Sequence, residues 1–462
     1  MVKLITQLKY SALFFIALLL FTIVNPYTGG DILAFLVLAF FLLYKLFGDY
    51  ALLVFLIIRP TIDYWRDYVV LSEDEFRFNV NAGISIILLA WSILFFIKNH
   101  EYWKQIPARR IWLVFLAWVA ITYTYTFDKS STVTEVLKAA NLFALFGVTF
   151  VMRFKYPTKF NRYFRKTLLI GALPPLALAI YQYFTHSGLM IDGVANRLYG
   201  TFAHPNILAT FALLLFIFSF DTFFKNKERW LFQPFNAWFK NQQDLYFLAF
   251  LFLAAIITLT YTRIAWIAFI FFLVAYGIIK ATKLTLSILA ILVVLYASFF
   301  PINHWLTSSF NINLQENAVI ARLTTRNREA DSIAWRRDVA NKVSPLFRDR
   351  PLLGYGYGSF ATVWDINKGI QNIWDNTSEA HNDYLKVAFE AGIIGLLLYL
   401  AIFAALLYRE IQYGKNHKWP NTIFILSILV YLILSLSDNM LHHTPVIWSL
   451  WAIWGYWSAE HA

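Results

Sequence analysis

Long apolar runs recur along almost the whole of this 462-residue chain, and they constrain its fold more than any other feature. Crossing the hydrocarbon core of a bilayer takes about 20 apolar residues in a helix. Only 14% of the residues are charged, whereas a soluble domain carries roughly 25%. This shortfall extends over the entire length. The sequence therefore predicts an all-α, polytopic membrane helical bundle.

The apolar runs predict about 12–14 transmembrane helices. The run at 49–59 is too short to cross fully unless its polar ends snorkel or the bilayer thins. We therefore keep a re-entrant pair over residues 31–59 as an alternative to two spans, and either choice leaves the downstream orientation unchanged. The candidate spans lie at about 10–25, 31–45, 49–59, 80–97, 111–127, 132–152, 166–185, 205–224, 244–260, 264–280, 284–300, 392–409, 420–437 and 443–458.

The distribution of Lys and Arg between successive loops predicts the orientation of the bundle. With the N-terminus inside, the inside segments hold most of the basic residues of the short loops. Because cytoplasmic loops are enriched in Lys and Arg, both termini are expected to be cytoplasmic. The same excess explains the net charge of +12 without a nucleic-acid partner. The outside positions are Arg59, Arg66, Arg77, Lys129, Arg197 and Arg263.

One long extramembrane segment, residues 301–391, falls on the outer side with this orientation. It is the candidate for a separate periplasmic or extracytoplasmic loop domain. The predicted division is spans 1–11 over residues 1–300, the loop domain over 301–391, and spans 12–14 over 392–462.

The outer segment is expected to contain short helices. Apolar residues among charges predict a helix over residues 317–346, although they follow the helical period only loosely. Pro345 and Pro351 would then end this helix. The glycines and tyrosines from Gly354 to Gly358 predict a flexible, aromatic turn.

Two further features of the composition bear on structure and function. The chain holds 26 Tyr and 17 Trp, which favour the headgroup level, so many are expected in interfacial belts. Cysteine is absent, which excludes disulfides, thiolate chemistry and Cys-based metal sites.

Polar residues gather at the predicted outer ends of several spans, where ionisable side chains are costly and usually functional. The segment 196–206 leads into a span through Pro205, which suits a first helical turn. His204 or Asn206 would cap this helix, whose positive dipole end would attract phosphate. Arg197 could hold a phosphate with two parallel hydrogen bonds. The alternative is an interfacial Arg that reaches the lipid headgroups.

Arg263 lies in an outer connection of only a few residues, after Thr260-Tyr-Thr262. The connection is so short that Arg263 is held at membrane depth. A lone Arg at the centre of a span costs about 2.5–3.5 kcal/mol, and less toward the interface. A distant acid or an anionic ligand is therefore expected as its partner. Asp438, at the outer end of the span at 420–437, is one candidate, and a helix-end cap is its alternative role.

His381 lies at the mouth of the span at 392–409, and an imidazole at this place could act as a general base. Asp383 and Glu390 are close enough in sequence to orient it or to pair with Lys386. The alternative is an interfacial His with satisfied hydrogen bonds. Gly392 and Gly395 would allow close helix approach.

Four motifs together resemble the O-antigen ligase family, which is related to the O-antigen and exopolysaccharide polymerases. They are Arg-Leu-Tyr-Gly-Thr-Phe-x-His-Pro-Asn from Arg197, Thr-x-Thr-Arg ending at Arg263, the loop segment 351–360, and His381-Asn382 followed after nine residues by Gly392-x-x-Gly395. The last has the family's signature spacing. The resemblance covers about residues 160–460, and Arg59-Pro-x-x-Asp63 adds to a match in hydropathy alone before that.

The resemblance implies a metal-independent glycosyltransferase without a cofactor. It would move a glycan from undecaprenyl pyrophosphate to an acceptor hydroxyl of lipid A–core or of another glycan. Arg197 and Arg263 would hold the pyrophosphate, and His381 would be the catalytic base. Direct displacement would invert the anomeric configuration. We expect supporting roles for His204, Asn206, Asn382, Glu390, Gly392, Gly395 and Asp438.

The implied location is the bacterial inner membrane, with the active site facing the periplasm. A polymerase of the same superfamily is the first alternative, because only the acceptor differs. A polysaccharide or lipid transporter is the second, although the paired repeats and broken helices typical of transporters are not seen. One departure from the family pattern concerns the loop helix: Asp331 stands four residues before Trp335, where the family often has Arg, and Arg336 and Arg337 follow instead.

Overall fold

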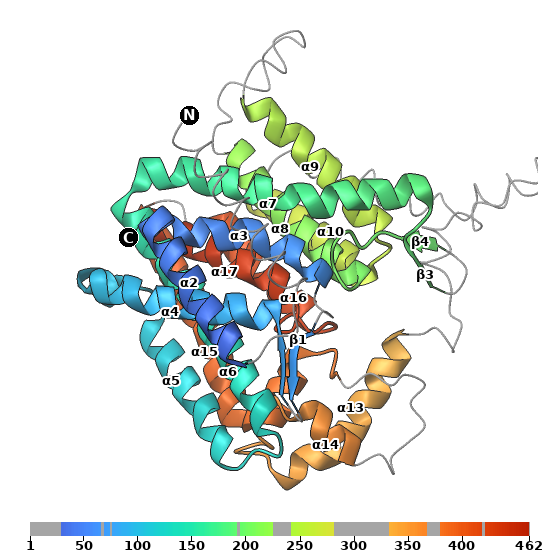
Figure 1. Ribbon diagram of the computed structural model, residues 1–462. Helices are drawn as coiled ribbons and strands as arrows, with labels where there is room; N and C mark the ends of the chain where they lie inside the picture. The colour runs from blue at the N-terminus through green and yellow to red at the C-terminus, as the bar shows by residue number, and fades with distance from the viewer. Residues whose placement is uncertain are drawn as a thin grey trace, which may run out of the picture.

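The structure is a computed structural model that describes residues 29–65, 69–73, 76–191, 195–224, 242–280, 332–366, 379–417 and 421–461. Within these ranges the chain forms a bundle of helices (Figure 1). Two short antiparallel hairpins accompany the helices. They pair β1 (Val69–Glu73) with β2 (Phe76–Asn79) and β3 (Leu189–Ile191) with β4 (Ala195–Arg197). The predicted all-α architecture is confirmed.

Every predicted span within the described ranges overlaps a helix, and the candidates at 10–25 and 284–300 lie outside them. The helices of the first half are α2 (Gly29–Phe47), α3 (Ala51–Ile62), α4 (Val80–Lys98), α5 (Arg109–Ile121), α6 (Lys129–Lys155) and α7 (Pro157–Thr185). Those that follow are α8 (Pro205–Phe224), α9 (Gln242–Leu259), α10 (Arg263–Lys280), α13 (Ser332–Asp349), α14 (Phe360–Ile366), α15 (Asp383–His417), α16 (Thr422–Leu434) and α17 (Thr444–Ser458).

Six helices in the described part of the chain are long and apolar enough to cross a membrane. The first runs through α2 and α3, and α4, α6, α7, α8 and α15 supply the others. Shorter apolar helices lie in α9, α10 and α16. The protein is therefore a multi-pass membrane protein. α3, whose span is the shortest in the sequence, is mostly buried and packs against α7 and α17.

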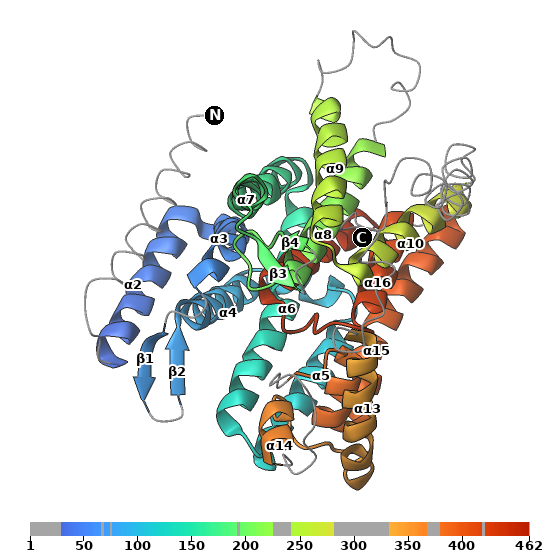
Figure 2. The ribbon, with the colours of Figure 1, turned by 90° about the vertical axis from the view of Figure 1, so that its right-hand side faces the viewer.

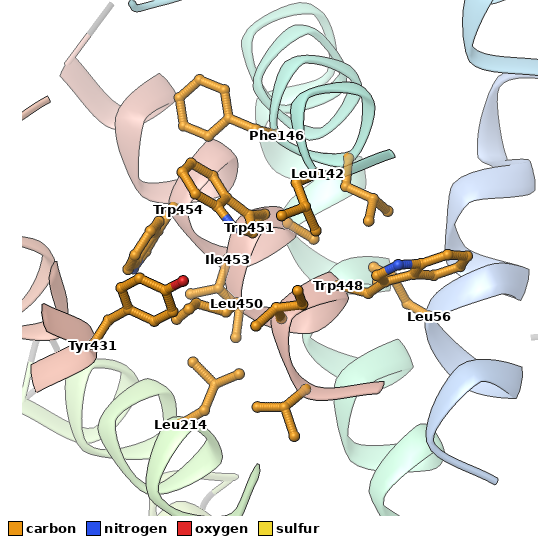
Figure 3. Packing of buried hydrophobic residues seen from close by; sticks show 14 of the residues in the cluster. Leu56, Leu142, Phe146, Leu214, Tyr431, Trp448, Leu450, Trp451, Ile453 and Trp454 are labelled. Carbon is orange, nitrogen blue, oxygen red and sulfur yellow. The ribbon is translucent and has the colours of Figure 1, made fainter. Parts of the chain in front are cut away.

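The core of the bundle lies around α17, whose tryptophans at 448, 451, 454 and 457 are all fully buried. Figure 3 shows Trp451 and Trp454 among Phe146, Tyr431 and neighbouring aliphatic side chains. The Trp451 and Trp454 rings meet edge to face with centroids 4.7 Å apart. The sequence predicted that many Trp side chains form interfacial belts, but the four tryptophans of α17 are core residues.

Two of the buried indole N–H groups of α17 donate hydrogen bonds to side chains of neighbouring helices. Trp454 donates from Nε1 to Ser427 Oγ at 2.9 Å, and Trp457 donates from Nε1 to Asp221 Oδ2 at 3.0 Å. A buried indole N–H normally needs such an acceptor. α17 also approaches α6 closely, since a Cβ at Gly455 would lie 2.2 Å from the Phe146 carbonyl oxygen. These contacts fix α17 at the centre of the bundle.

The described part of the outer segment folds against the start of α15. Val339 and Val343 of α13, Tyr355, and Phe360 of α14 share a small apolar core with Phe389 of α15. Figure 2 shows α13 lying beside α15. The prediction that Pro345 ends the loop helix is wrong, because α13 continues through it to Asp349. The division of the chain into three domains stays a prediction.

The segment from Gly354 to Gly358 is packed, whereas the sequence suggested a flexible turn. Tyr355 N donates to the Phe389 carbonyl at 3.0 Å, and Gly356 N donates to the Glu390 carbonyl at 2.8 Å. Tyr355 and Tyr357 are both buried. The glycines let this backbone lie directly on α15, so the outer segment is joined to the helix that follows His381.

Candidate active site

Arg197 ends β4 and is buried at the point where three chain segments meet. Its Nε donates to the Thr260 carbonyl at 2.8 Å, and its Nη2 donates to Asn206 Oδ1 at 3.1 Å and to Thr262 Oγ1 at 3.0 Å. These three bonds, all to neutral oxygens, orient the guanidinium. The geometry thus presents an oriented cation beside the N-terminus of α8.

The N-terminus of α8 is capped by His204. Its Nδ1 accepts from the backbone N–H of Asn206 at 3.2 Å. Burial lowers the pKa of His204 to about 4, and the nearby charge of Arg197 acts in the same direction. The ring is therefore neutral near pH 7 and can accept through Nδ1. Of the two residues expected to cap α8, His204 does so, while the Asn206 side chain joins Arg197 to Asp438.

The short connection between α9 and α10 brings Arg263 to the same end of the bundle. Tyr261 adopts a left-handed φ of 53°, and Arg263 begins α10 directly after Thr262. Because Thr260 and Thr262 both accept from Arg197, the two arginines predicted from separate motifs lie on adjoining segments. We call this group, comprising Arg197, His204, Asn206, Thr260, Thr262 and Arg263, the arginine side.

Asp438 lies in the connection between α16 and α17 and is buried. Its Oδ2 accepts from Asn206 Nδ2 at 3.0 Å. Its Oδ1 lies 3.8 Å from His381 Nδ1 and 3.6 Å from His443 Nε2. Burial alone would raise the pKa of Asp438, but the charges of His443 and His381 hold it well below its usual value. Asp438 is therefore an anion shared by two imidazoles.

His381 precedes the first turn of α15 in a left-handed conformation, with φ of 46°. The next residue fixes its place: Asn382 Oδ1 accepts from Leu385 N at 2.9 Å, and Asn382 Nδ2 donates to the Leu436 carbonyl at 3.0 Å. Asn382 thus caps α15 and ties it to the connection that carries Asp438. The His381 side chain is 25% exposed, so a substrate can reach it.

Asp383, at the start of α15, binds the connection that follows α16 at two points. Its Oδ2 accepts from Ser435 Oγ at 2.9 Å, and its Oδ1 accepts from Leu441 N at 3.2 Å. These contacts brace the segment that carries Asp438, so Asp383 acts on His381 through that segment. We call His381, Asn382, Asp383, Asp438 and His443 the histidine side.

Glu390, Gly392 and Gly395 lie farther along α15, where they shape the helix. Glu390 Oε1 accepts from Phe360 N at 3.2 Å, which holds the outer segment. Gly392 has φ of 68°, and a Cβ there would lie 2.0 Å from the Leu352 carbonyl oxygen. A Cβ at Gly395 would lie 3.3 Å from Trp118 Nε1 of α5. The expected close approach of a helix is found at Gly395, whereas Gly392 meets the backbone of the turn at Leu352.

A second charged group lies beside the histidine side. Lys386 is buried, with its Nζ 3.4 Å from Glu379 Oε2, and His442 Nδ1 lies 3.5 Å from Glu379 Oε1. Burial would raise the pKa of Glu379, but the charges of Lys386 and His442 lower it below its usual value. Glu379 thus anchors the backbone just before His381.

Two functional candidates escaped the sequence analysis. His443 shares Asp438 with His381, and nothing in the sequence marked it as different from His442. Arg336 of α13 is the other. Burial lowers the pKa of Arg336, the charge of Asp438 raises it and the charge of Arg263 lowers it, so Arg336 senses a charged residue of each side. The sequence did offer one sign of a role for Arg336: it follows Trp335, where the chain departs from the family pattern.

The structure therefore gathers Arg197, Asn206, His381 and Asp438 into one connected site, with His204 as a cap. Among the residues that the structure describes, no group of three or more His, Asp or Glu side chains is arranged to hold a metal ion. The arrangement combines one oriented cation, Arg197, suited to phosphate oxygens, with an imidazole next to a carboxylate, suited to proton transfer.

Comparisons with known proteins bear on the family to which part of the chain is similar. No curated protein matches the chain. Residues 248–400 match the family model described as O-Antigen ligase. This range includes Arg263, Arg336 and His381, and within residues 248–400 it supports the resemblance to the O-antigen ligase family seen in the sequence.

Proposed function

We propose that the protein is a membrane glycosyltransferase that moves a glycan from undecaprenyl pyrophosphate to an acceptor hydroxyl, as an O-antigen ligase would. The observation that supports this most is the hydrogen bond from Asn206 to Asp438, which joins the arginine side to the histidine side at 3.0 Å. A transferase of this kind needs its leaving group and its base on opposite sides of one reacting carbon. The linked sides offer that arrangement.

On the arginine side, Arg197 and Arg263 bind the pyrophosphate. The bond between the anomeric carbon and the pyrophosphate oxygen breaks, and the guanidinium groups stabilise the charge that develops on that oxygen. Arg197 is held rigidly by three hydrogen bonds, so little reorganisation is needed as the charge forms. Arg336 adds a third positive charge near Arg263. Neither a cofactor nor a metal ion is required in this scheme.

On the histidine side, His381 removes the proton of the acceptor hydroxyl while its oxygen attacks the anomeric carbon. Since Nδ1 of His381 faces Asp438, Nε2 is the nitrogen that takes the proton. The anionic Asp438 stabilises the imidazolium that forms and orients the ring, and it is a positioning residue. A single displacement inverts the anomeric configuration.

The membrane orientation is part of the same proposal. α17 runs from Thr444, next to the histidine side, to Ser458, whose carbonyl accepts from Arg409 at 3.0 Å. Near that second end, Arg153 lies 3.8 Å from Glu460. Basic residues are enriched on the cytoplasmic side of membrane proteins, so the site would face the periplasm of a bacterial inner membrane, with both termini cytoplasmic.

A reconstitution tests the proposal. Purified protein is mixed with an undecaprenyl-pyrophosphate-linked glycan, with and without lipid A–core, in the presence of EDTA. Glycan on lipid A–core is expected, and the description of the matching domain favours this acceptor. Longer glycan on the carrier alone would establish a polymerase of the same superfamily. Transfer by His381→Ala at the wild-type rate would contradict the assignment of the base.

A further inference from the structure

The motif Arg59-Pro60-x-x-Asp63 at the end of α3 has no role in the scheme above, yet it contacts residues that lie next to each side of the site in the chain. Arg59 is 3% exposed, and its Nη1 lies 3.5 Å from Asp63 Oδ1. Its Nη2 donates to Thr444 Oγ1, and its guanidinium lies 5.5 Å from the centroid of the Trp448 ring. Arg59 therefore holds the first turn of α17, which directly follows His443.

The next residue of the motif holds the arginine side. The Pro60 carbonyl accepts from Thr201 Oγ1 at 2.7 Å. Thr201 is buried and lies between Arg197 and His204 in the segment that enters α8. Adjacent residues at the tip of α3 thus contact the segments next to the two sides separately: Arg59 binds Thr444 through its guanidinium, and Pro60 binds Thr201 through its backbone carbonyl.

The segment around Thr201 is fixed on its other face by α7. Gln182 Oε1 accepts from Gly200 N at 2.9 Å, and Gln182 Nε2 donates to the Gly200 carbonyl at 3.2 Å. A Cβ at Gly200 would lie 2.5 Å from the Pro175 carbonyl oxygen. Because α3 itself packs on α7, the Thr201 contact places the arginine side against a rigid two-helix support.

We propose that the tip of α3 is a bracket that sets the distance between the arginine side and the histidine side, with Arg59 and Thr201 as positioning residues. The inference rests on the proposed transferase function. Two groups that act on one reacting carbon must keep their separation closely, and a misplacement of about 1 Å can cost about 100-fold in rate. A common anchor on one helix end supplies that constraint.

Because the two contacts are separate, single substitutions distinguish the bracket from general structural support. Thr444→Val removes the acceptor of Arg59 and should lower kcat about 10-fold, with the donor KM unchanged. Thr201→Val removes the donor to Pro60 and should also lower kcat about 10-fold, because this contact helps to set the same separation, and it should raise the donor KM as well, because Thr201 lies in the segment that carries Arg197. Arg59→Lys, which cannot reach Asp63 and Thr444 together, should resemble Thr444→Val and leave the donor KM alone.

Matched variants control for folding. Thr444→Ser keeps the hydroxyl and should restore the wild-type kcat. Thr134→Val removes an exposed hydroxyl of α6 that bonds only within its own helix, to the Ser130 carbonyl, and should change neither constant. The double variant Arg59→Lys with Thr444→Val should be no slower than either single variant, since both break one contact.

The outcomes separate the bracket from the proposed function. If the wild-type protein transfers glycan and either Thr201→Val or Thr444→Val keeps the wild-type kcat, the bracket is wrong and α3 only supports the fold. A Thr444→Ser variant as slow as Thr444→Val would likewise overturn it. A wild-type protein without transfer would instead contradict the proposed function.

Discussion

The arginine side and the histidine side of the site are built with different physical forces. Arg197 is held by neutral oxygens at 2.8 to 3.1 Å, so its orientation depends on hydrogen-bond geometry. His381 and His443 are held near Asp438 at 3.8 and 3.6 Å, so their arrangement depends on charge. The comparison teaches that one site can separate the binding of a phosphate from the handling of a proton.

Removing the base should have the largest effect. His381→Ala is expected to lower kcat about 100- to 10,000-fold, because general-base catalysis contributes about that much. The donor KM should stay within about twofold, since no contact of Arg197 passes through His381. Initial rates over a range of donor concentrations give both constants. A large rise in KM would show that the two sides are not separable.

The second largest effect should come from replacing the planar guanidinium of Arg263 or Arg197 with an ammonium group. Arg263→Lys and Arg197→Lys keep the charge but lose the planar fork, and kcat/KM should fall about 10- to 100-fold. The loss should appear mainly in the donor KM. Wild-type activity in Arg263→Lys would reduce its role to simple charge.

Neutralising Asp438, the anion shared by His381 and His443, should lower kcat less than removing the base does. Asp438→Asn keeps the size of the side chain but removes the charge that both imidazoles face, and kcat should fall about 10-fold or more. The donor KM should also rise slightly, because Asp438 accepts from Asn206, which in turn accepts from Arg197. The test is a comparison of both constants with those of His381→Ala. A kcat equal to wild type would remove Asp438 from the proton-transfer path.

Arg336 tests how far the arginine side extends into the outer segment. Arg336→Gln should raise the donor KM a few-fold, about 2- to 10-fold, because a third cation near Arg263 is lost. Arg337, its exposed neighbour in α13, supplies the matched control, and Arg337→Gln should behave as wild type. The effect should shrink at high salt, where charge interactions are screened. Equal effects of the two variants would place Arg336 outside the site.

The smallest effect should be on stability in mild acid. His204 stays neutral in the folded protein until about pH 4, whereas its ordinary pKa is 6.5. The unfolded chain therefore takes up a proton first, and stability falls as the pH drops from 6.5 toward 4, by at most about 1.4 kcal/mol per pH unit. His204→Asn keeps a capping side chain and should flatten this dependence in thermal unfolding. An unchanged slope would show that other groups cause it.

The sequence predicted the helices well, because long apolar runs depend on composition alone. It also singled out Arg197, Arg263 and His381, since each stands in a short motif that can be read from the sequence alone, and their roles stay predictions. It could not predict that the tryptophans of α17 are buried, since burial depends on which helices surround α17. The helix through Pro345 was missed because packing against α15 outweighs one lost hydrogen bond.

The least predictable contacts join residues that are far apart in the chain. Thr444 meets Arg59, and Asn206 meets Asp438, across separations that no local pattern encodes. His443 and Arg336 were missed for the same reason. Their neighbours, His442 and Arg337, are identical in type and differ only in the direction that the fold gives them.

The division of work between the two sides is tested most directly by donor binding in the absence of acceptor. The Kd of the undecaprenyl-pyrophosphate-linked glycan would be measured for the wild-type protein, His381→Ala and Arg263→Lys. The account predicts that His381→Ala binds within about twofold of wild type, while Arg263→Lys binds about 10-fold or more weakly. Weakening of the same size in both variants would contradict the separation of phosphate binding from proton transfer.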